Sequence, residues 1–179
     1  MNLVERVKAI LLTPKTEWPV IAGEPGDAGY LFKNYVAILA AIPAVAGLIG
    51  FSLAGMGVGT AIKLAILQYV MYCVSWYVVA LVIDMLAPTF GGQKDQPSAL
   101  KVSAYSATAA WVAGIFQLIP LLSILGLLGG LYSFYLLWLG LPVLMRSPPE
   151  RATTYTAAVI VVTIIIFIVI RLIFFALVF

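Results

Sequence analysis

Few side chains in this sequence could perform chemistry within its long apolar stretches. The 179 residues contain no histidine and one cysteine, Cys73. Without histidine, Ser-His-Asp triads and Cys-His pairs are excluded, and a single cysteine has neither a disulfide partner nor the companions that a metal site requires. We therefore expect no catalytic residue, no metal and no cofactor, and we expect that the protein is not an enzyme.

Three charged residues, Lys63, Asp84 and Arg171, interrupt the apolar stretches and are candidate functional groups for that reason. Lys63 and Asp84 lie 21 residues apart, about 31 Å along a helix, so each can reach an opposite surface of a bilayer. The same arithmetic places Arg171 near the outer surface. We interpret all three as markers of helix ends, with a proton or ion path as the alternative. For the Asp84 carboxylate we expect Lys101 as the partner, because it opens the next apolar stretch.

Two neutral polar side chains, Gln68 and Gln117, also lie within apolar stretches. Both are expected in the outer half of their helices, where a hydrogen bond across helices would contribute about 1 kcal/mol. We interpret them as structural, with a substrate site as the alternative. Aromatic residues are expected to pack along the second and fourth spans, on faces formed by Tyr69, Tyr72 and Trp76 and by Tyr132, Tyr135 and Trp138.

The composition indicates lipid as the solvent for these helices. Apolar residues make up 64% of the chain and charged residues 9%, against about half and about a quarter in a soluble globular domain. The apolar runs are continuous rather than alternating, and an open sheet edge cannot exist in lipid, so strands are excluded. The predicted fold class is all-α, a polytopic membrane helical bundle with five transmembrane helices.

A span needs about 20 residues to cross roughly 30 Å of hydrocarbon as a helix. The predicted spans, which form one transmembrane domain over residues 34–179, cover residues 34–53, 61–86, 104–120, 124–145 and 153–177. The third and fourth share one continuous apolar stretch, which must turn back on itself near Pro120.

Residues 1–33 are predicted to form a cytoplasmic N-terminal segment. Apolar residues recur at helical spacing over residues 2–12, which predicts an amphipathic helix, and Thr13 and Pro14 are suited to begin a second helix that contains Trp18. In one alternative these helices lie in the membrane interface, with Trp18 at headgroup level. In the other they pack against the protein's own cytoplasmic face, and the sequence leaves both open.

Lysine and arginine residues predict the orientation. On one side of a five-span topology lie Arg6, Lys8, Lys15, Lys33, Lys94, Lys101, Arg146 and Arg151, and on the other Lys63 and Arg171. By the positive-inside rule the N-terminus is cytoplasmic and the C-terminus lies outside.

Small residues recur four apart on three spans, a spacing that lets helix backbones approach closely. The sets are Ala46, Gly50 and Ala54; Ala110 and Gly114; and Gly126 and Gly130. Whether these faces pack within one chain or between chains is left open.

Three segments give the chain a family resemblance: VERVKAILLTPKTEW, FGGQKDQPSALKVSAYSAT, and YSFYLLWLGLPVLM with PPERATTYTAAV after it. In their order and spacing they resemble the Yip family of Ypt/Rab-interacting membrane proteins, particularly its bacterial branch. The resemblance implies five spans, a cytoplasmic N-terminus and an exoplasmic C-terminus, here in a bacterial cytoplasmic (inner) membrane. Eukaryotic members are linked to vesicle traffic, to prenylated Rab GTPases and to assembly with one another. Their Asp-Leu-Tyr-Gly-Pro segment is absent here, as is a proline near Thr108 and Ala109, so the partner does not carry over.

Two functions are consistent with these features. The leading hypothesis is a non-enzymatic membrane scaffold that organises lipid or partner proteins, through self-association or another membrane protein. The alternative is a small transporter or channel with Gln68, Gln117 and the aromatics along its path. A water-filled cavity that reaches both glutamines would favour the transporter, and a dry bundle the scaffold. The net charge of +3 is too small to indicate nucleic acid.

Overall fold

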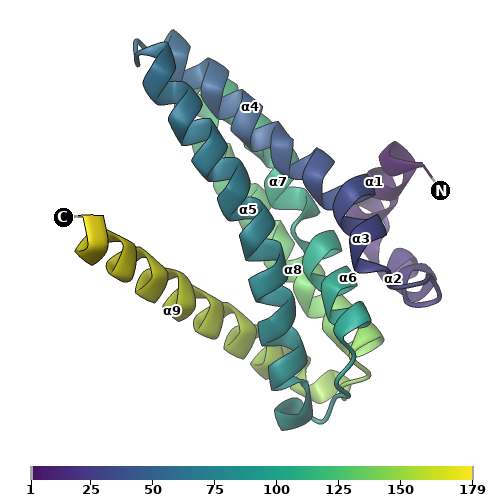
Figure 1. The fold of residues 1–179 in the computed structure, drawn as a ribbon. Coiled ribbons are helices and arrows are strands. Elements are labelled where there is room, and N and C mark those ends of the chain that lie inside the picture. The colour runs from purple at the N-terminus through teal and green to yellow at the C-terminus, as the bar shows by residue number, and fades with distance from the viewer. Residues whose placement is uncertain (1, 179) are drawn as a thin grey trace.

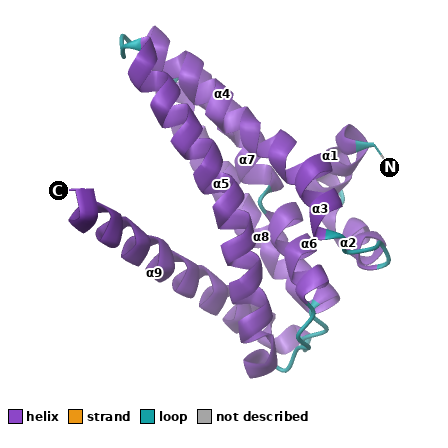
Figure 2. Ribbon diagram, in the orientation of Figure 1, coloured by secondary structure: helices purple, strands orange, loops and turns teal. Residues whose placement is uncertain are grey.

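A computed structural model describes residues 2–178, with the side chains of Pro120 and of residues 170–178 left out. Every regular element in this part of the chain is a helix, as Figure 2 shows. Within it, four helices are long and apolar enough to cross a membrane: Ala28–Leu53, Val58–Phe90, Leu121–Leu144 and Pro149–Val169. The chain is therefore a multi-pass, all-helical membrane protein.

The first two membrane helices form an antiparallel pair. The first joins α3 (Ala28–Leu31), a π-helical turn (Phe32–Val36) and α4 (Ala37–Leu53), and the second is α5 (Val58–Leu86), extended by a 3₁₀ turn (Ala87–Phe90). Both begin earlier than predicted, at Ala28 rather than residue 34 and at Val58 rather than residue 61. The chain reverses at Gly55, whose φ of +90° is a conformation that residues with a Cβ rarely adopt.

The predicted third span, residues 104–120, is not a single helix. It is divided among α6 (Gln96–Ser106), α7 (Thr108–Ala113) and a 3₁₀ turn (Gly114–Leu118). At the first break the hydroxyls of Ser106 and Thr108 each bond to the carbonyl three residues earlier, at 3.3 and 2.8 Å. Hydroxyls near the backbone compete in this way with regular helical bonding, and hydropathy does not register the effect.

The predicted reversal at Pro120 is confirmed. Ile119 is extended, and a second 3₁₀ turn (Pro120–Ile124) leads into α8 (Leu125–Leu144). Proline has no backbone N–H to continue the preceding helix, so the chain leaves it there. Within this segment α6 packs against α5 and α8, whereas α7 and the first 3₁₀ turn pack between α4 and α8.

The last helix, α9 (Ala152–Val178), follows a 3₁₀ turn (Pro149–Arg151) and diverges from the bundle, as Figure 1 shows. Its first turns contact α5 and α8. There Tyr155 is fully buried, donates a hydrogen bond to the carbonyl of Ile83 and stacks on Phe90 with ring centroids 5.0 Å apart. One end of α9 is thus fixed, while the rest extends away from its neighbours.

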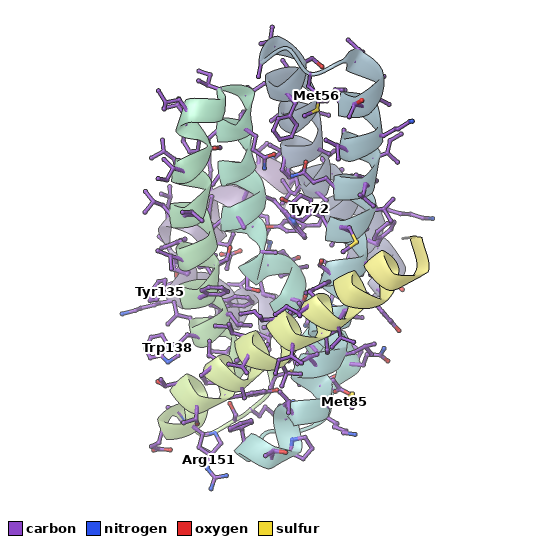
Figure 3. All side chains as sticks on the ribbon, turned by 90° about the vertical axis from the view of Figure 1, so that its left-hand side faces the viewer. Met56, Tyr72, Met85, Tyr135, Trp138 and Arg151 are labelled. Atoms are coloured by element: carbon purple, nitrogen blue, oxygen red, sulfur yellow. The ribbon has the colours of Figure 1, made fainter. Side chains whose placement is uncertain are left out.

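Two ends of the bundle are distinguished in Figure 3. Met56 lies at the turn between α4 and α5, and Met85 and Arg151 lie at the opposite end. We call these the Met56 end and the Arg151 end. Large apolar side chains stay exposed along the membrane helices, including Ile66 (60%), Leu127 (66%) and Ile164 (51%). Apolar faces this extensive are expected where lipid is the solvent.

Residues 2–31 form a layer on the flank of the bundle opposite α9 (Figure 1). This N-terminal layer contains α1 (Leu3–Leu12), α2 (Pro14–Ala22) and α3. Asn2 and Glu5 form a reciprocal capping box that starts α1. The layer is attached to α8, since the Tyr132 hydroxyl donates to the carbonyl of Leu11 at 2.7 Å.

Candidate functional site

A buried ionic cluster lies inside the N-terminal layer. The Arg6 guanidinium bridges the carboxylates of Glu17 and Glu24, and Arg6 and Glu17 are only 5% and 8% exposed. The guanidinium also lies 5.6 Å from the centroid of the Tyr105 ring on α6, a cation–π distance. Arg6 therefore joins α1, α2 and the following loop to the bundle.

Lys101 binds the C-terminal end of α2. Its ammonium donates to the carbonyls of Ile21 (3.0 Å), Ala22 (3.3 Å) and Glu24 (2.9 Å). The last carbonyls of a helix have no partner within it, and a cation suits the negative end of the helix dipole. Burial lowers the pKa of Lys101, and the carboxylates of Asp95 and Glu24 oppose that shift.

The expected pairing of Lys101 with Asp84 is wrong. All three donors of the ammonium are directed at the N-terminal layer, and the ion pairs of the described residues belong to Arg6. One carboxylate oxygen of Asp84 is buried without a hydrogen-bond partner among those residues. Sequence proximity suggested the pair, but the side of α6 that Lys101 occupies faces α2.

Tyrosines continue the cluster toward the membrane helices. The hydroxyls of Tyr35 and Thr108 share a hydrogen bond of 2.6 Å, and the rings of Tyr35 and Tyr105 meet edge to face at 4.6 Å. Tyr105 is 7% exposed, yet within the described part of the chain its hydroxyl has no hydrogen-bond partner. That hydroxyl borders an open space.

The open space is a cavity of about 830 Å³ between the N-terminal layer and α6. Its polar lining includes Arg6, Glu24, Asp27, Lys101 and Tyr105. Asp27 caps α3, accepting a hydrogen bond from the backbone N–H of Tyr30. The cavity thus has acceptors and donors fixed by secondary structure on one side and by the Arg6 cluster on the other.

Gln68 and Gln117 lie elsewhere and contact each other. The Gln68 amide donates to the side-chain oxygen of Gln117 at 3.1 Å and to the Tyr72 hydroxyl at 3.2 Å. Gly47 of α4 faces both glutamines, since a Cβ there would lie 3.0 and 3.1 Å from their side-chain oxygens. The predicted hydrogen bond across helices is confirmed, and α4 closes over it.

The aromatic face of α5 is bonded to neighbouring segments, whereas on α8 the rings contact one another and Tyr135 and Trp138 stay exposed. On α5, Tyr69 donates to the carbonyl of Ala37 and Trp76 to that of Leu100. On α8 the rings of Tyr132, Tyr135 and Trp138 follow one another at 5.5 and 6.2 Å, and Figure 3 shows the last two side by side.

The remaining candidates lie apart from the cavity. Lys63 is exposed in the second turn of α5, near the Met56 end. The side chain of Arg171 lies outside the described residues. Trp18 is fully buried, and a Cβ at Gly140 of α8 would meet its ring at 2.7 Å. The interfacial placement of Trp18 is therefore wrong, and the alternative, packing on the protein's own face, is correct.

The small-residue faces divide into two kinds. A Cβ at Gly50 would lie 1.9 Å from the carbonyl oxygen of Gln117, and one at Gly114 would lie 2.4 Å from Pro43, so these glycines permit contacts within the chain. A Cβ at Gly126 or Gly130 would meet nothing within 4 Å. The α8 pair leaves an open strip on the helix.

The sequence interpretation missed Arg6, Glu17, Glu24 and Tyr105 as members of a site. One signal was present: Arg6 lies four residues before Ile10, so both share a face of α1, and both are buried. A charge on the apolar face of an amphipathic helix requires a partner when that face packs on protein.

No curated protein and no solved structure significantly matches this chain. The Yip1 domain matches residues 8–170, which include most of the N-terminal layer and all four long helices up to the last turns of α9. Because the match covers far more than half of the sequence, the chain belongs to the Yip1 domain family.

Proposed function

We propose that this Yip1 domain protein is a non-enzymatic membrane scaffold, which organises lipid or partner proteins and self-associates. The observation that carries the proposal is the attachment of the N-terminal layer. Trp18 is fully buried against Gly140, and Arg6 links two carboxylates beneath the surface. A layer fixed in this way presents a constant surface beside the membrane, which suits binding.

Contacts between two loops favour five membrane crossings over four. The loops after α5 and α8 bond to each other: the N–H of Gln93 donates to the carbonyl of Met145 at 2.9 Å, and Arg146 donates to the Gln93 side chain at 3.2 Å. These bonds support a topology in which the two loops lie on one side of the membrane and the interrupted segment of α6 and α7 makes a fifth crossing. With the excess of lysine and arginine at this end, the N-terminus is cytoplasmic and the C-terminus lies outside, in a bacterial inner membrane.

The transporter alternative has weaker support. It needs Gln68 and Gln117 to line a water path, and instead the two side chains bond to each other under Gly47. Neither glutamine lines the 830 Å³ cavity, and neither lines a second, apolar groove of about 360 Å³ along α4.

The test compares assembly with flux in one preparation. The purified protein is reconstituted in lipid nanodiscs, where light scattering gives the copies per particle, and in liposomes, where release of a trapped dye and of K⁺ is measured. A scaffold gives more than one copy per particle and no release above that of protein-free liposomes. A single copy, or release that Gln68→Leu abolishes, would instead support the transporter.

A further inference from the structure

The cavity adjoins an apolar groove on the outer face of α4 and the broken third segment. Ile38 lines both the 830 Å³ cavity and the groove of about 360 Å³. One wall of the groove follows α4 through Ile38, Ala41, Ile42, Val45, Ala46 and Ile49. The other wall is formed by Ile115 and Leu118 of the broken third segment. A chamber that carries charged groups and adjoins an apolar groove matches an amphiphile.

The length of the groove matches one acyl chain in one leaflet. Ile38 and Ile49 are 11 residues apart, about 16 Å along a helix. Half of a hydrocarbon core about 30 Å thick is about 15 Å. The groove is therefore long enough for one extended acyl chain that enters at Ile38 and lies along α4 as far as Ile49.

The cavity lies at the level along the bundle where a lipid headgroup is expected. Phe32, next to the cavity-lining Leu31, stacks on Trp76 of α5 with ring centroids 5.8 Å apart. Trp76 is 18 residues from Val58, the start of α5, a rise of about 27 Å. If the hydrocarbon begins at the Met56 end, its other boundary falls at this level, about 30 Å away.

The charges around the cavity select the head. Its cations are already engaged: Lys101 by three carbonyls, and Arg6 by Glu17 and Glu24. The cavity lining has two carboxylates, Glu24 and Asp27, against these two cations, and Glu17, which shares Arg6, lies outside the lining. One oxygen of Asp27 already caps α3. The unoccupied hydrogen-bonding groups are thus acceptor-rich, with the buried Tyr105 hydroxyl beside them.

We propose that the cavity and groove bind one zwitterionic phospholipid with an ammonium head, of the phosphatidylethanolamine class. The ammonium binds the carboxylates of Asp27 and Glu24, the Tyr105 hydroxyl donates to the phosphate, and one acyl chain lies along α4. The inference rests on the proposed scaffold function and deepens it, since it names the lipid that the scaffold holds.

The experiment uses phosphatidylethanolamine with a photoactivatable group at the end of one acyl chain, in nanodiscs that hold the full-length protein. Mass spectrometry locates the cross-links after illumination. We expect labelling around Ile49, Ile115 and Leu118, reduced several-fold when the probe carries a phosphatidylglycerol head. Labels spread evenly over the lipid-facing sides of α5 and α9, or equal labelling by both heads, would overturn the proposal.

Matched variants separate the two parts of the site. Asp27→Asn keeps a side chain that caps helices well but removes the charge, and should abolish the preference for the ammonium head. Tyr105→Phe removes one hydrogen bond and should lower labelling about fivefold, whereas Tyr135→Phe on α8 should not. Val45→Phe fills the groove and should suppress labelling, while Val74→Phe, at a similarly exposed valine of α5, should leave it unchanged.

The outcome for the lipid site is independent of the outcome for the scaffold. Copies per nanodisc are counted in the same samples. If labelling by the ammonium lipid is unspecific while several copies remain in each particle, the lipid site is refuted and the scaffold stands. If the protein is monomeric and labels specifically in the groove, self-association fails and the lipid site stands.

Discussion

Arg6 is the side chain that most strongly ties the N-terminal layer together, because it is shared by two carboxylates from different segments. Removing one partner of a buried ion pair leaves the other charged and without compensation. Here the residue left behind would be Glu17, which is 8% exposed. The ring of Tyr105 would lose its cation as well.

Arg6→Met should therefore lower the free energy of unfolding by about 3 kcal/mol. Thermal unfolding in detergent micelles measures the effect. Lys8→Met is the matched control, since Lys8 is an exposed cation on the same helix, and it should change little. Adding Glu17→Leu to Arg6→Met should restore part of the loss, because no unpaired charge then remains at that position. Equal melting temperatures for Arg6→Met and Lys8→Met would contradict this role.

Residue pairs could be predicted only where the geometry of a single helix decides them. The rise per residue placed Gln68 and Gln117 at similar depth, and they do bond. The partner of Lys101 depended on which element covers α6, and the carbonyls at the end of α2 do so. That information is tertiary, so neither hydropathy nor spacing contains it.

At the scale of elements, the close approach of α4 to the broken third segment decides the packing of the bundle. Gly50 lies directly against the carbonyl of Gln117, and Gly114 against Pro43. The short 3₁₀ turns bring the backbone of that segment within reach of α4.

Gly50→Ala should therefore destabilise the protein, because its Cβ would lie 1.9 Å from a backbone oxygen that no side-chain rotation can move away. Overpacking of this kind costs about 1–3 kcal/mol. Gly130→Ala is the control, since its Cβ would meet nothing within 4 Å and alanine favours a helix interior by up to about 1 kcal/mol. Melting temperatures in the same detergent should separate the two variants. A Gly50→Ala protein as stable as Gly130→Ala would show that α4 does not approach so closely.

Trp18 offers a test of the N-terminal layer as an element of the fold. Trp18→Ala removes a fully buried side chain, which costs about 3–5 kcal/mol where a cavity remains. The layer should then detach before the bundle unfolds, so trypsin should cut faster after Lys8 and Lys15. Trp138→Ala is the control, because Trp138 is 39% exposed. Unchanged cleavage rates in Trp18→Ala would indicate that the layer is not held by this contact.

The apolar stretches predicted which segments become helices, and Pro120 predicted the reversal between the third and fourth. They did not predict how the third segment would be wound. Its break depends on the hydroxyls of Ser106 and Thr108, and its tight turns on contact with α4. Hydropathy indicates only how long an apolar segment is. It carries no information on hydroxyl bonds to the backbone or on contact with a neighbouring helix.

Across the whole molecule, the two ends of the bundle differ in how they are packed. Toward the Arg151 end the core contains Trp18, Ile83, Leu141 and Tyr155, all without solvent exposure apart from traces. Toward the Met56 end and along α9 the apolar side chains face outward, so lipid completes the packing. The Arg151 end is therefore a tightly packed base from which the membrane helices extend.

Whether the interrupted third segment crosses the membrane decides this account. If only the four long helices crossed, Lys94 and the C-terminus would lie on the same side. If α6 and α7 add a crossing, they lie on opposite sides.

The measurement is labelling of single cysteines in intact cells with a membrane-impermeant maleimide. Cys73 is replaced by serine, and Lys94→Cys and Phe179→Cys are introduced one at a time, Phe179 being the last residue of the sequence. The account predicts that Phe179→Cys reacts in intact cells and that Lys94→Cys reacts only after permeabilisation. Reaction of both cysteines under the same condition would contradict five crossings.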